Sequence, residues 1–586
     1  HPHSRHIDEV QFRRAEYFFT RRRYLEARDA YAAITTRGSV SDFFELALYK
    51  LGWTLYKQEL HEEALNQYVA LLDYKISAGY DFDQSRDEDS SRRISDTFRV
   101  MSLSFSSIGG PEAITAYFAA NGNRLYEDRV YRHLGEFYFE KLRYQDAASA
   151  YEAFVALHPN HHSAPHFGMR VIEIYEEGGF PKLVLSSKKE FAARYGLGAD
   201  YWQHFPIEEA AEVVAYLKGN LRDLANHYHA AYQDPEQATA AAASFTEAQQ
   251  WYRAFLGSFS EDAEAPVIHQ QLADLLFEHE DFGEAAFEYE RTAYDYPAHD
   301  QASEAGYAAI FAHREQQRRA PSEEHDAVRE AAVASTLRFV DAFPAHKHAA
   351  VVLGAAVDDL YEMGRFEPSI ATGRRLLEAY PEADAAVRRS AWLAVAHSAF
   401  GIDDYPQAER AYARVLEMTV EGDESRQSVV DNLAATIYQQ GEQAGEAGDH
   451  RAAADHFLRI AQVTPDSAIR PSADYDAASA LIRLEDWDAA VAVLNAFREV
   501  HSDHALRGEA TKQLAHIYRE QGELERAAVE YERIAAEAED DELRREALLV
   551  AGELYEDAEV PDRAITAYLG YVERHPEPLE VVVETR

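Results

Sequence analysis

Cysteine is absent from the 586 residues of the chain. This absence excludes disulfides, Cys-ligated zinc and thiol nucleophiles. It leaves the compartment open, because both a reducing cytosol and a periplasm accommodate such a chain. The sequence also lacks a signal-peptide pattern and an apolar run of 18 residues. Both ends resemble interrupted repeats, so we expect a longer protein. The lack of a signal or anchor in this sequence therefore says little about the compartment.

Lysine is scarce, at roughly ten residues, so arginine carries most of the positive charge. The 58 basic residues face 103 acidic ones, which gives a formal net charge of −45. A field of this sign disfavours nucleic acid and anionic membrane surfaces. It suits a basic partner, and it equally suits simple solubility or a salt-loving organism.

Recognisable catalytic motifs are missing as well. The sequence contains no Gly-rich phosphate loop, HExxH pair or nucleophile elbow. Paired carboxylates occur everywhere, as expected for solvated helix faces. We therefore predict no enzyme within this chain and no cofactor. The competing hypothesis is an enzyme whose catalytic domain lies outside this sequence.

A histidine-rich loop is the best candidate for a metal, ahead of the N-terminal His1, His3 and His6. It contains four imidazoles that could hold zinc or nickel, namely His158, His161, His162 and His166. The loop lies between predicted hairpins, and no recognisable neighbour would orient the imidazoles by hydrogen bonding to their free ring nitrogens. We accordingly predict no metal site.

The pattern that organises the chain is clearest over residues 126–159, YEDRVYRHLGEFYFEKLRYQDAASAYEAFVALHP. Its apolar and small residues recur at i, i+3, i+4 and i+7, which predicts two antiparallel helices joined by a tight turn. The first helix carries Tyr131, Leu134, Gly135 and Tyr138, and the second carries Ala147, Tyr151 and Phe154 before Pro159. Gly135 and Ala147 are small enough to let the helices approach closely. Such a hairpin cannot bury both apolar faces alone, so it needs similar neighbours.

These residues resemble the tetratricopeptide (TPR) repeat, whose pattern is a large residue, Leu-Gly and Tyr, then Ala, an aromatic, an apolar residue and Pro. Related hairpins recur along nearly the whole chain. We predict an all-α fold, a right-handed α-solenoid superhelix of about 13–14 TPR-like helical hairpins. We expect N-terminal repeats over 1–160 with an exposed acidic insertion near 77–93, irregular hairpins over 161–265, and a C-terminal array over 266–586.

The resemblance implies a non-catalytic scaffold that binds a protein or peptide partner in its concave groove. First-helix residues that the pattern leaves outside the core are the candidates for contact: Phe12, Phe19, Tyr49, Trp53, Tyr56, Arg132, Glu136 and Phe139. The alternative is that some of them pack against neighbouring hairpins. The Lys/Asn set that clamps chaperone C-termini in other TPR grooves is not found here.

Two stretches, LALYKLGWTLYKQELHEEALNQYVALLDYK and HLGEFYFEKLRYQDAASAYEAFV, resemble bacterial envelope TPR proteins. That group includes accessory proteins of TonB–ExbB–ExbD and Tol–Pal energy-transducing systems. The resemblance implies a periplasmic scaffold, while a cytoplasmic location stays open. We separately expect no direct membrane insertion within this sequence. The alternative is an assembly or export scaffold for polysaccharide or outer-membrane proteins. The sequence leaves the partner and the oligomeric state open.

Overall fold

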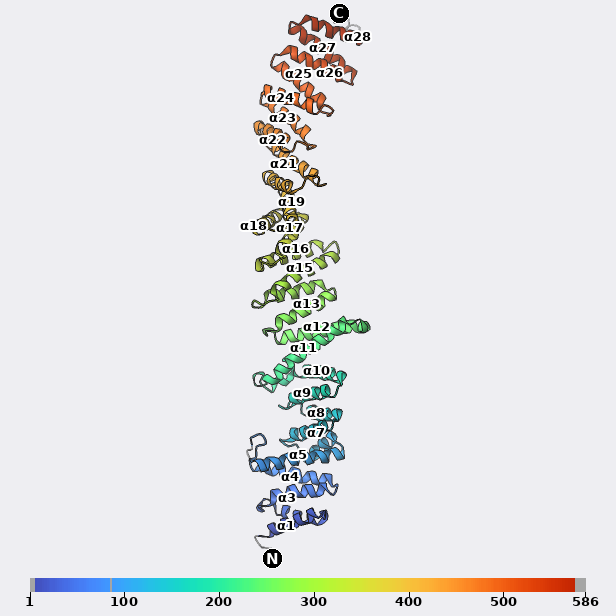
Figure 1. The fold of residues 1–586 in the computed structure, drawn as a ribbon, viewed down its shortest axis with the longest axis vertical. Coiled ribbons are helices and arrows are strands. Elements are labelled where there is room, and N and C mark those ends of the chain that lie inside the picture. Colours follow the sequence, from blue (N-terminus) through green and yellow to red (C-terminus); the bar gives the residue numbers. More distant parts are fainter. Residues whose placement is uncertain (1–5, 85–86, 575–586) are drawn as a thin grey trace. The chain divides into compact units, whose positions relative to one another are not determined.

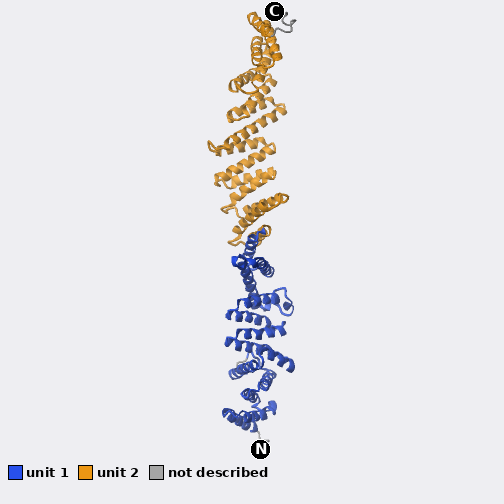
Figure 2. Ribbon diagram, turned by 90° about the vertical axis from the view of Figure 1, so that its right-hand side faces the viewer, with its two compact units in different colours: residues 1–281 blue, residues 282–586 orange. Residues whose placement is uncertain are grey.

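A computed structural model describes residues 6–84 and 87–574 of the chain. Within these ranges the chain forms 28 α-helices, four short 3-10 helices and no strand (Figure 1). Consecutive helices pack against one another in pairs, which confirms the predicted all-α solenoid of helical hairpins. The chain divides into two compact units, residues 1–281 and 282–586 (Figure 2).

Unit 1 contains thirteen α-helices among its described residues. The odd-numbered helices are the first helices of each pair and are called A helices here, and the even-numbered ones are called B helices. Their bounds are α1 Ile7–Thr20, α2 Tyr24–Thr35, α3 Phe44–Tyr56, α4 His61–Ser77, α5 Glu88–Ile108, α6 Pro111–Asn121, α7 Glu127–Glu140, α8 Tyr144–Leu157, α9 Ala164–Glu177, α10 Pro181–Tyr195, α11 Ala211–Gln233, α12 Ala241–Ser258 and α13 Ala265–Glu278. The four 3-10 helices, Gly38–Val40, Asp200–Gln203, Ile207–Glu209 and Pro235–Ala240, also lie in this unit.

Unit 2 contains the remaining fifteen α-helices of the described residues. Most are 13 to 18 residues long, and α21 reaches 21 residues. Their bounds are α14 Phe282–Tyr294, α15 Ala302–Arg319, α16 His325–Ala342, α17 Ala349–Glu362, α18 Phe366–Ala379, α19 Ala385–Gly401, α20 Tyr405–Met418, α21 Arg426–Glu446, α22 His450–Val463, α23 Arg470–Arg483, α24 Trp487–Val500, α25 Arg507–Glu520, α26 Leu524–Glu537, α27 Asp541–Asp557 and α28 Pro561–Arg574.

Glycine allows the two helices of several hairpins to approach closely. A Cβ atom added to Gly135 would lie 2.4 Å from a ring carbon of Tyr151, sixteen residues later. Because real Cβ atoms do not come so close to ring carbons, only glycine fits there without rearrangement. The same spacing and contact recur at three other pairs: Gly52 with Tyr68, Gly441 with Phe457, and Gly552 with Tyr568. The expected role of Gly135 is confirmed.

Most turns between paired helices place one residue in the left-handed region of backbone space. At the α7–α8 turn this residue is Leu142, with a φ of 58°, and at the α9–α10 turn it is Gly179, with a φ of 72°. The left-handed region costs a non-glycine residue free energy, so a repeated turn of this shape accepts glycine most readily.

The expected insertion at 77–93 is shorter than the sequence indicates. Helix α5 begins at Glu88, because the Asp87 carboxylate accepts a hydrogen bond from the backbone N–H of Ser90 and caps the helix. Before it, Phe82 packs against the rings of Phe98 and Tyr126. Residues 85 and 86 of the expected insertion lie outside the described residues. So do residues 1–5 of the segment assigned to 1–160 and residues 575–586 of the segment assigned to 266–586.

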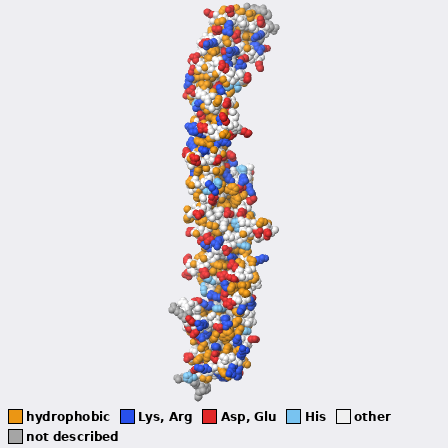
Figure 3. All heavy atoms as spheres, in the orientation of Figure 1, with side chains coloured by type: hydrophobic (Ala, Val, Ile, Leu, Met, Phe, Trp, Pro, Cys, Tyr) orange, Lys and Arg blue, Asp and Glu red, His pale blue; other side chains and the backbone are white. Residues whose placement is uncertain are grey.

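No helix in the described ranges is long and apolar enough to cross a membrane. Acidic, basic and apolar side chains are interspersed over the face of each unit seen in Figure 3. The net negative charge is thus spread along that face instead of gathering in one patch.

Candidate partner-binding surface

The eight candidate groove residues all lie on A helices of unit 1, and none is fully buried. Helix α1 carries Phe12 and Phe19, α3 carries Tyr49, Trp53 and Tyr56, and α7 carries Arg132, Glu136 and Phe139. Arg132 is exposed and the other seven are partly exposed. Whether they touch a partner stays a prediction, but the structure shows what each contacts within the chain.

Tyr49 and Trp53 converge on one carboxylate of the neighbouring A helix. The Tyr49 hydroxyl and the Trp53 Nε1–H donate to Asp96 Oδ2 at 2.6 and 2.9 Å. Arg99 donates to the other oxygen of Asp96 at 2.9 Å and lies over the Trp53 ring, 5.4 Å from its centroid. Partial burial raises the pKa of Asp96, but these hydrogen bonds outweigh it and hold that pKa below its usual value.

Glu136, on the A helix two hairpins after α3, accepts hydrogen bonds much as Asp96 does. Its carboxylate accepts two hydrogen bonds from Arg170 of α9, at 2.9 and 3.0 Å, and one from the Tyr151 hydroxyl at 2.5 Å. Burial raises the pKa of Glu136, and the Arg170 and Tyr151 hydrogen bonds bring it below its usual value. The Arg170 guanidinium also covers the ring of Phe139, 4.5 Å from its centroid.

Glu16 on α1 repeats this arrangement. It accepts from the Tyr31 hydroxyl, fifteen residues later, and pairs with Lys50, thirty-four residues later, at 3.3 Å. Both spacings match those of Glu136. In both hairpins the A-helix carboxylate therefore binds its own B helix through a tyrosine and the next A helix through a cation. These two acids hold neighbouring hairpins in register.

The other candidates make aromatic and cation contacts. Phe12 packs against Tyr31 and Phe43 and lines an open hollow of about 610 Å³ with Glu16. Phe19 contacts the ring of Tyr24, and Tyr56 contacts that of Trp53. Arg132 lies 5.6 Å from the Phe167 centroid and 3.9 Å from Asp128. The alternative expectation, that some candidates pack against neighbouring hairpins, is thus confirmed for Trp53 and Tyr49.

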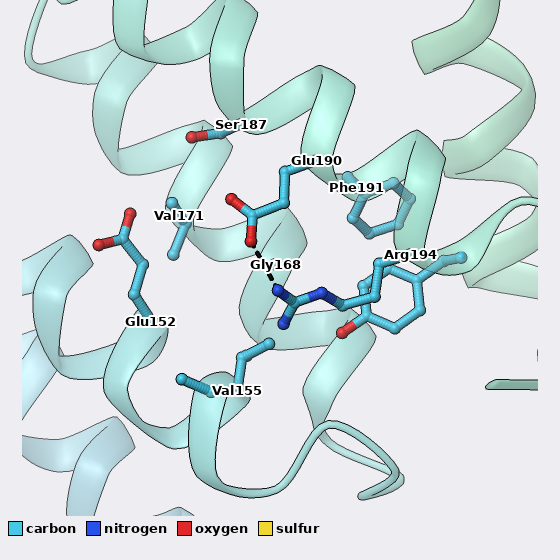
Figure 4. Close-up of a pocket in the computed structure, with 10 residues that line it drawn as sticks. Glu152, Val155, Gly168, Val171, Ser187, Glu190, Phe191 and Arg194 are labelled. Atoms are coloured by element: carbon cyan, nitrogen blue, oxygen red, sulfur yellow. Dashed lines mark hydrogen bonds and ion pairs between the residues drawn. The ribbon is translucent and has the colours of Figure 1, made fainter. Parts of the chain in front are cut away.

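A second feature, which the sequence analysis missed, is a pocket of about 310 Å³ between α8, α9 and α10. Its apolar surface comes from both B helices and from α9 between them: Val155, Ala156, Gly168, Val171 and Phe191. Glu152 and the Glu190–Arg194 pair stand on facing walls, with Val155 and Val171 between them (Figure 4). Because most of its walls are B helices, this pocket lies on a different layer from the A-helix candidates.

The pocket holds two carboxylates and one cation. Arg194 donates to Glu190 at 2.6 Å, whereas Glu152 accepts only from the uncharged Tyr175 hydroxyl, at 3.1 Å. The surrounding protein removes solvent from Glu152 and raises its pKa, and the nearby charge of Glu190 adds to this effect while the Tyr175 hydrogen bond opposes it. In the described part of the chain, no cation is paired with Glu152.

Tyr195 contributes a buried polar group to the same pocket. Its side chain is 1% exposed, and its hydroxyl has no hydrogen-bond partner among the described residues. Burial raises the pKa of Tyr195, so the hydroxyl keeps its proton at neutral pH. An unsatisfied buried hydroxyl is costly and uncommon in a native structure.

The histidine-rich loop between α8 and α9 is used for capping. His161 Nδ1 accepts a hydrogen bond from the backbone N–H of Ser163 at 3.1 Å, and His346 and His504 accept from the residue two positions later in the same way. His158 and His166 lie near different carboxylates, Glu127 at 3.4 Å and Glu212 at 3.6 Å. Local hydrogen bonding thus gives a structural explanation for the histidines at 158–166.

Hairpins, glycine–aromatic contacts and left-handed turns together define an α-solenoid of TPR-like helical hairpins. Family models of the tetratricopeptide repeat match residues 130–161 and 475–542, so the chain contains TPR repeats. No curated protein matches the chain.

Two solved structures illustrate what the chain is similar to. The crystal structure of yeast Tom70 is 12% identical over 88% of this chain and 97% of its own, with a TM-score of 0.20. A tetratricopeptide repeat protein from Parabacteroides merdae is 13% identical over 49% of this chain and 98% of its own, also with a TM-score of 0.20.

Proposed function

We propose that the chain is a non-catalytic scaffold that binds a protein partner along the A-helix face of unit 1. The observation that carries this proposal is the Asp96 cluster, in which an acid and an arginine hold Trp53 and Tyr49 in fixed, partly exposed positions. Aromatic and arginine side chains dominate binding hot spots, and side chains held in place lose little entropy on binding.

The pairing of the carboxylates with cations favours a protein over a polysaccharide as the partner. A groove that passes polysaccharide would present free acids and aromatics along its length. In unit 1, Glu16, Asp96 and Glu136 are each engaged by a cation within the chain. An assembly or export scaffold for polysaccharide or outer-membrane proteins is therefore the second candidate.

The test uses the whole chain as bait in native envelope and cytosol fractions, followed by measurement of affinity for each captured protein. Arg132→Ala combined with Tyr56→Ala should weaken a groove-bound partner by roughly thirtyfold or more, since truncated hot spots cost about 1–2 kcal/mol each. Arg28→Ala on α2, a B helix, is the control for charge and should bind normally. Equal affinity of the groove variant and the wild type would contradict the proposal.

Within this function we further propose an accessory role in a TonB/ExbB/ExbD-type energy-transducing system of the bacterial periplasm. Its support is the resemblance of the α3–α4 and α7–α8 hairpins to envelope TPR proteins. Capture of ExbB, ExbD, TonB or Tol components, lost in the groove variant, is the expected result. Capture of synthase or export components would favour the second candidate, and exclusively cytosolic partners would remove the periplasmic assignment.

A further inference from the structure

The pocket between α8, α9 and α10 is lined by a glycine, Gly168, where the preceding hairpin has a tyrosine. Helices α9 and α10 repeat the pattern of α7 and α8 at an offset of 37 residues, so that Gly168 corresponds to Tyr131 and Phe191 to Phe154. Tyr131 is 0% exposed and packs 5.6 Å from the Phe154 ring. A Cβ atom on Gly168 would lie 3.1 Å from the ring of Phe191.

Other hairpins fill this position with a large side chain. Four residues before the close-approach glycine stand Leu48, Tyr131, Ile437 and Leu548, and all four are buried. Gly168 has no side chain to place there, and the rings of Phe191 and Tyr195 come within 3.1 and 3.5 Å of where its Cβ would lie. The pocket that Gly168 lines has a volume of about 310 Å³, at the lower end of the range of ligand pockets.

The charges that line the pocket indicate which kind of group it would bind. Glu190 is neutralised by Arg194, but Glu152 faces it across the pocket, and among the described residues its only partner is the Tyr175 hydroxyl. The hydroxyl of Tyr195, which has no partner within residues 6–84 and 87–574, is also available to accept a hydrogen bond. Val155, Val171 and Phe191 provide apolar contact between these polar groups. A complementary side chain therefore has an apolar stem and a positively charged end with several donors.

We propose that this pocket receives an arginine side chain of a protein partner, with its stem against Val155 and Val171 and its guanidinium between Glu152, Glu190 and the Tyr195 hydroxyl. A guanidinium carries five donors in a planar arrangement and serves several separated acceptors at once, which the compact ammonium of lysine does less well. The proposal adds a B-helix contact to the proposed scaffold function and rests on it.

The experiment needs no partner protein. The whole chain, with ¹³C-labelled valine methyl groups, is titrated with the capped tripeptide acetyl-Gly-Arg-Gly-amide and followed by NMR. We expect saturable shifts of the Val155 and Val171 methyl signals. The tripeptide with citrulline, which has the shape of arginine without its charge, should produce none, and the lysine tripeptide should bind more weakly.

Variants separate the pocket from general charge effects. Glu152→Gln should weaken binding by roughly tenfold, because it removes a charged acceptor. Tyr195→Phe should weaken it less, and Gly168→Tyr, which refills the space as Tyr131 does, should abolish it. Glu177→Gln, an exposed charge on α9 away from the pocket, is the matched control. Circular dichroism establishes that each variant is folded.

Several outcomes would overturn the proposal. They are an absence of saturable shifts with the arginine tripeptide, equal binding of citrulline, equal weakening by Glu177→Gln, and tighter binding of a tyrosine tripeptide. The last would assign the pocket to an aromatic side chain. The tripeptide titration does not depend on the A-helix variants. If the titration fails, the proposed partner binding by the A-helix face still stands. If the A-helix variant binds its partner normally, the titration still reports whether the pocket binds arginine.

Discussion

The α7–α8 and α9–α10 hairpins share a fold and differ in how completely they are packed. In the first, Gly135 allows the Tyr151 ring to approach, and Glu136 accepts from the Tyr151 hydroxyl. In the second, Ile172 and Lys188 stand at the positions of Gly135 and Tyr151. Lys188 reaches away to Glu176 and Asp223, at 3.4 and 2.8 Å.

This difference shows that a repeat keeps its fold without the glycine–aromatic contact between its two helices when other contacts hold the helices together. The backbone of α9–α10 keeps its helices and its left-handed turn, yet this hairpin has a pocket at Gly168 and, at Tyr195, a hydroxyl with no partner in the described part of the chain. The same architecture thus contains one hairpin built for packing and one built around a pocket.

The largest expected difference between the hairpins is in their response to acid. His133 on α7 stacks on Phe98 with ring centroids 4.6 Å apart, and burial lowers its pKa from 6.5 to about 4. The folded protein keeps His133 neutral while the unfolded chain binds a proton below pH 6.5. Stability of α7 should therefore be full above pH 6.5 and fall by up to about 3 kcal/mol as the pH decreases to 4.

The corresponding residue of α9 is Arg170, which stays charged throughout this range. Hydrogen exchange measured by mass spectrometry at pH values from 7 to 4, corrected for intrinsic rates, compares the two hairpins. His133→Gln should remove most of the α7 dependence, and His166→Gln, an exposed histidine of α9, should leave α9 unchanged. An unaltered slope in His133→Gln would assign the acid sensitivity to other groups.

A smaller effect is expected from adding one methyl group to each hairpin. In Gly135→Ala the new Cβ would lie 2.4 Å from Tyr151, so overpacking outweighs the better helix propensity of alanine, with a net loss of about 2 kcal/mol. In Gly168→Ala the closest atom is at 3.1 Å and the pocket gives Phe191 room to move, so we expect a change near zero. Urea denaturation and local exchange protection measure both, and equal losses would show that the pocket gives no relief.

The smallest effect concerns the turns. Leu142 is 70% exposed and holds a φ of 58°, whereas the equivalent residue of α9–α10 is Gly179. Leu142→Gly should stabilise its hairpin by about 0.5–1 kcal/mol, and Gly179→Leu should destabilise by a similar amount. Thermal unfolding of this reciprocal pair tests the turn geometry, and changes of the same sign in both would contradict it.

The fold could be predicted from the sequence because its signals are local. Apolar residues at i, i+3 and i+4 placed the hairpin of residues 126–159 within a few residues of α7 and α8. The start of α5 was missed because capping by Asp87 interrupts a polar stretch that resembles a loop. The three-part division of the chain stays a prediction beside the two compact units that the structure defines.

The candidate surface could be predicted only in part. Helical periodicity indicates which residues of α1, α3 and α7 leave the core, but it contains no information on partners from other helices. Asp96 meets Trp53 from 43 residues away, and Arg170 meets Glu136 from 34. The pocket did have a signal, namely a glycine at position 168 where the repeat expects a large residue. Its meaning became visible only once Glu152 and Tyr195 were located around it.

Two A-helix acids, Glu16 and Glu136, pair with a cation 34 residues later, and this pairing has a mechanical consequence. Lys50 with Glu16 and Arg170 with Glu136 each tie one hairpin to the next. A tensile force applied along unit 1 would therefore act on each of these junctions in turn along the array. The weakest junction would break first. Rupture force should depend on a single junction and the extension before rupture on the number of hairpins.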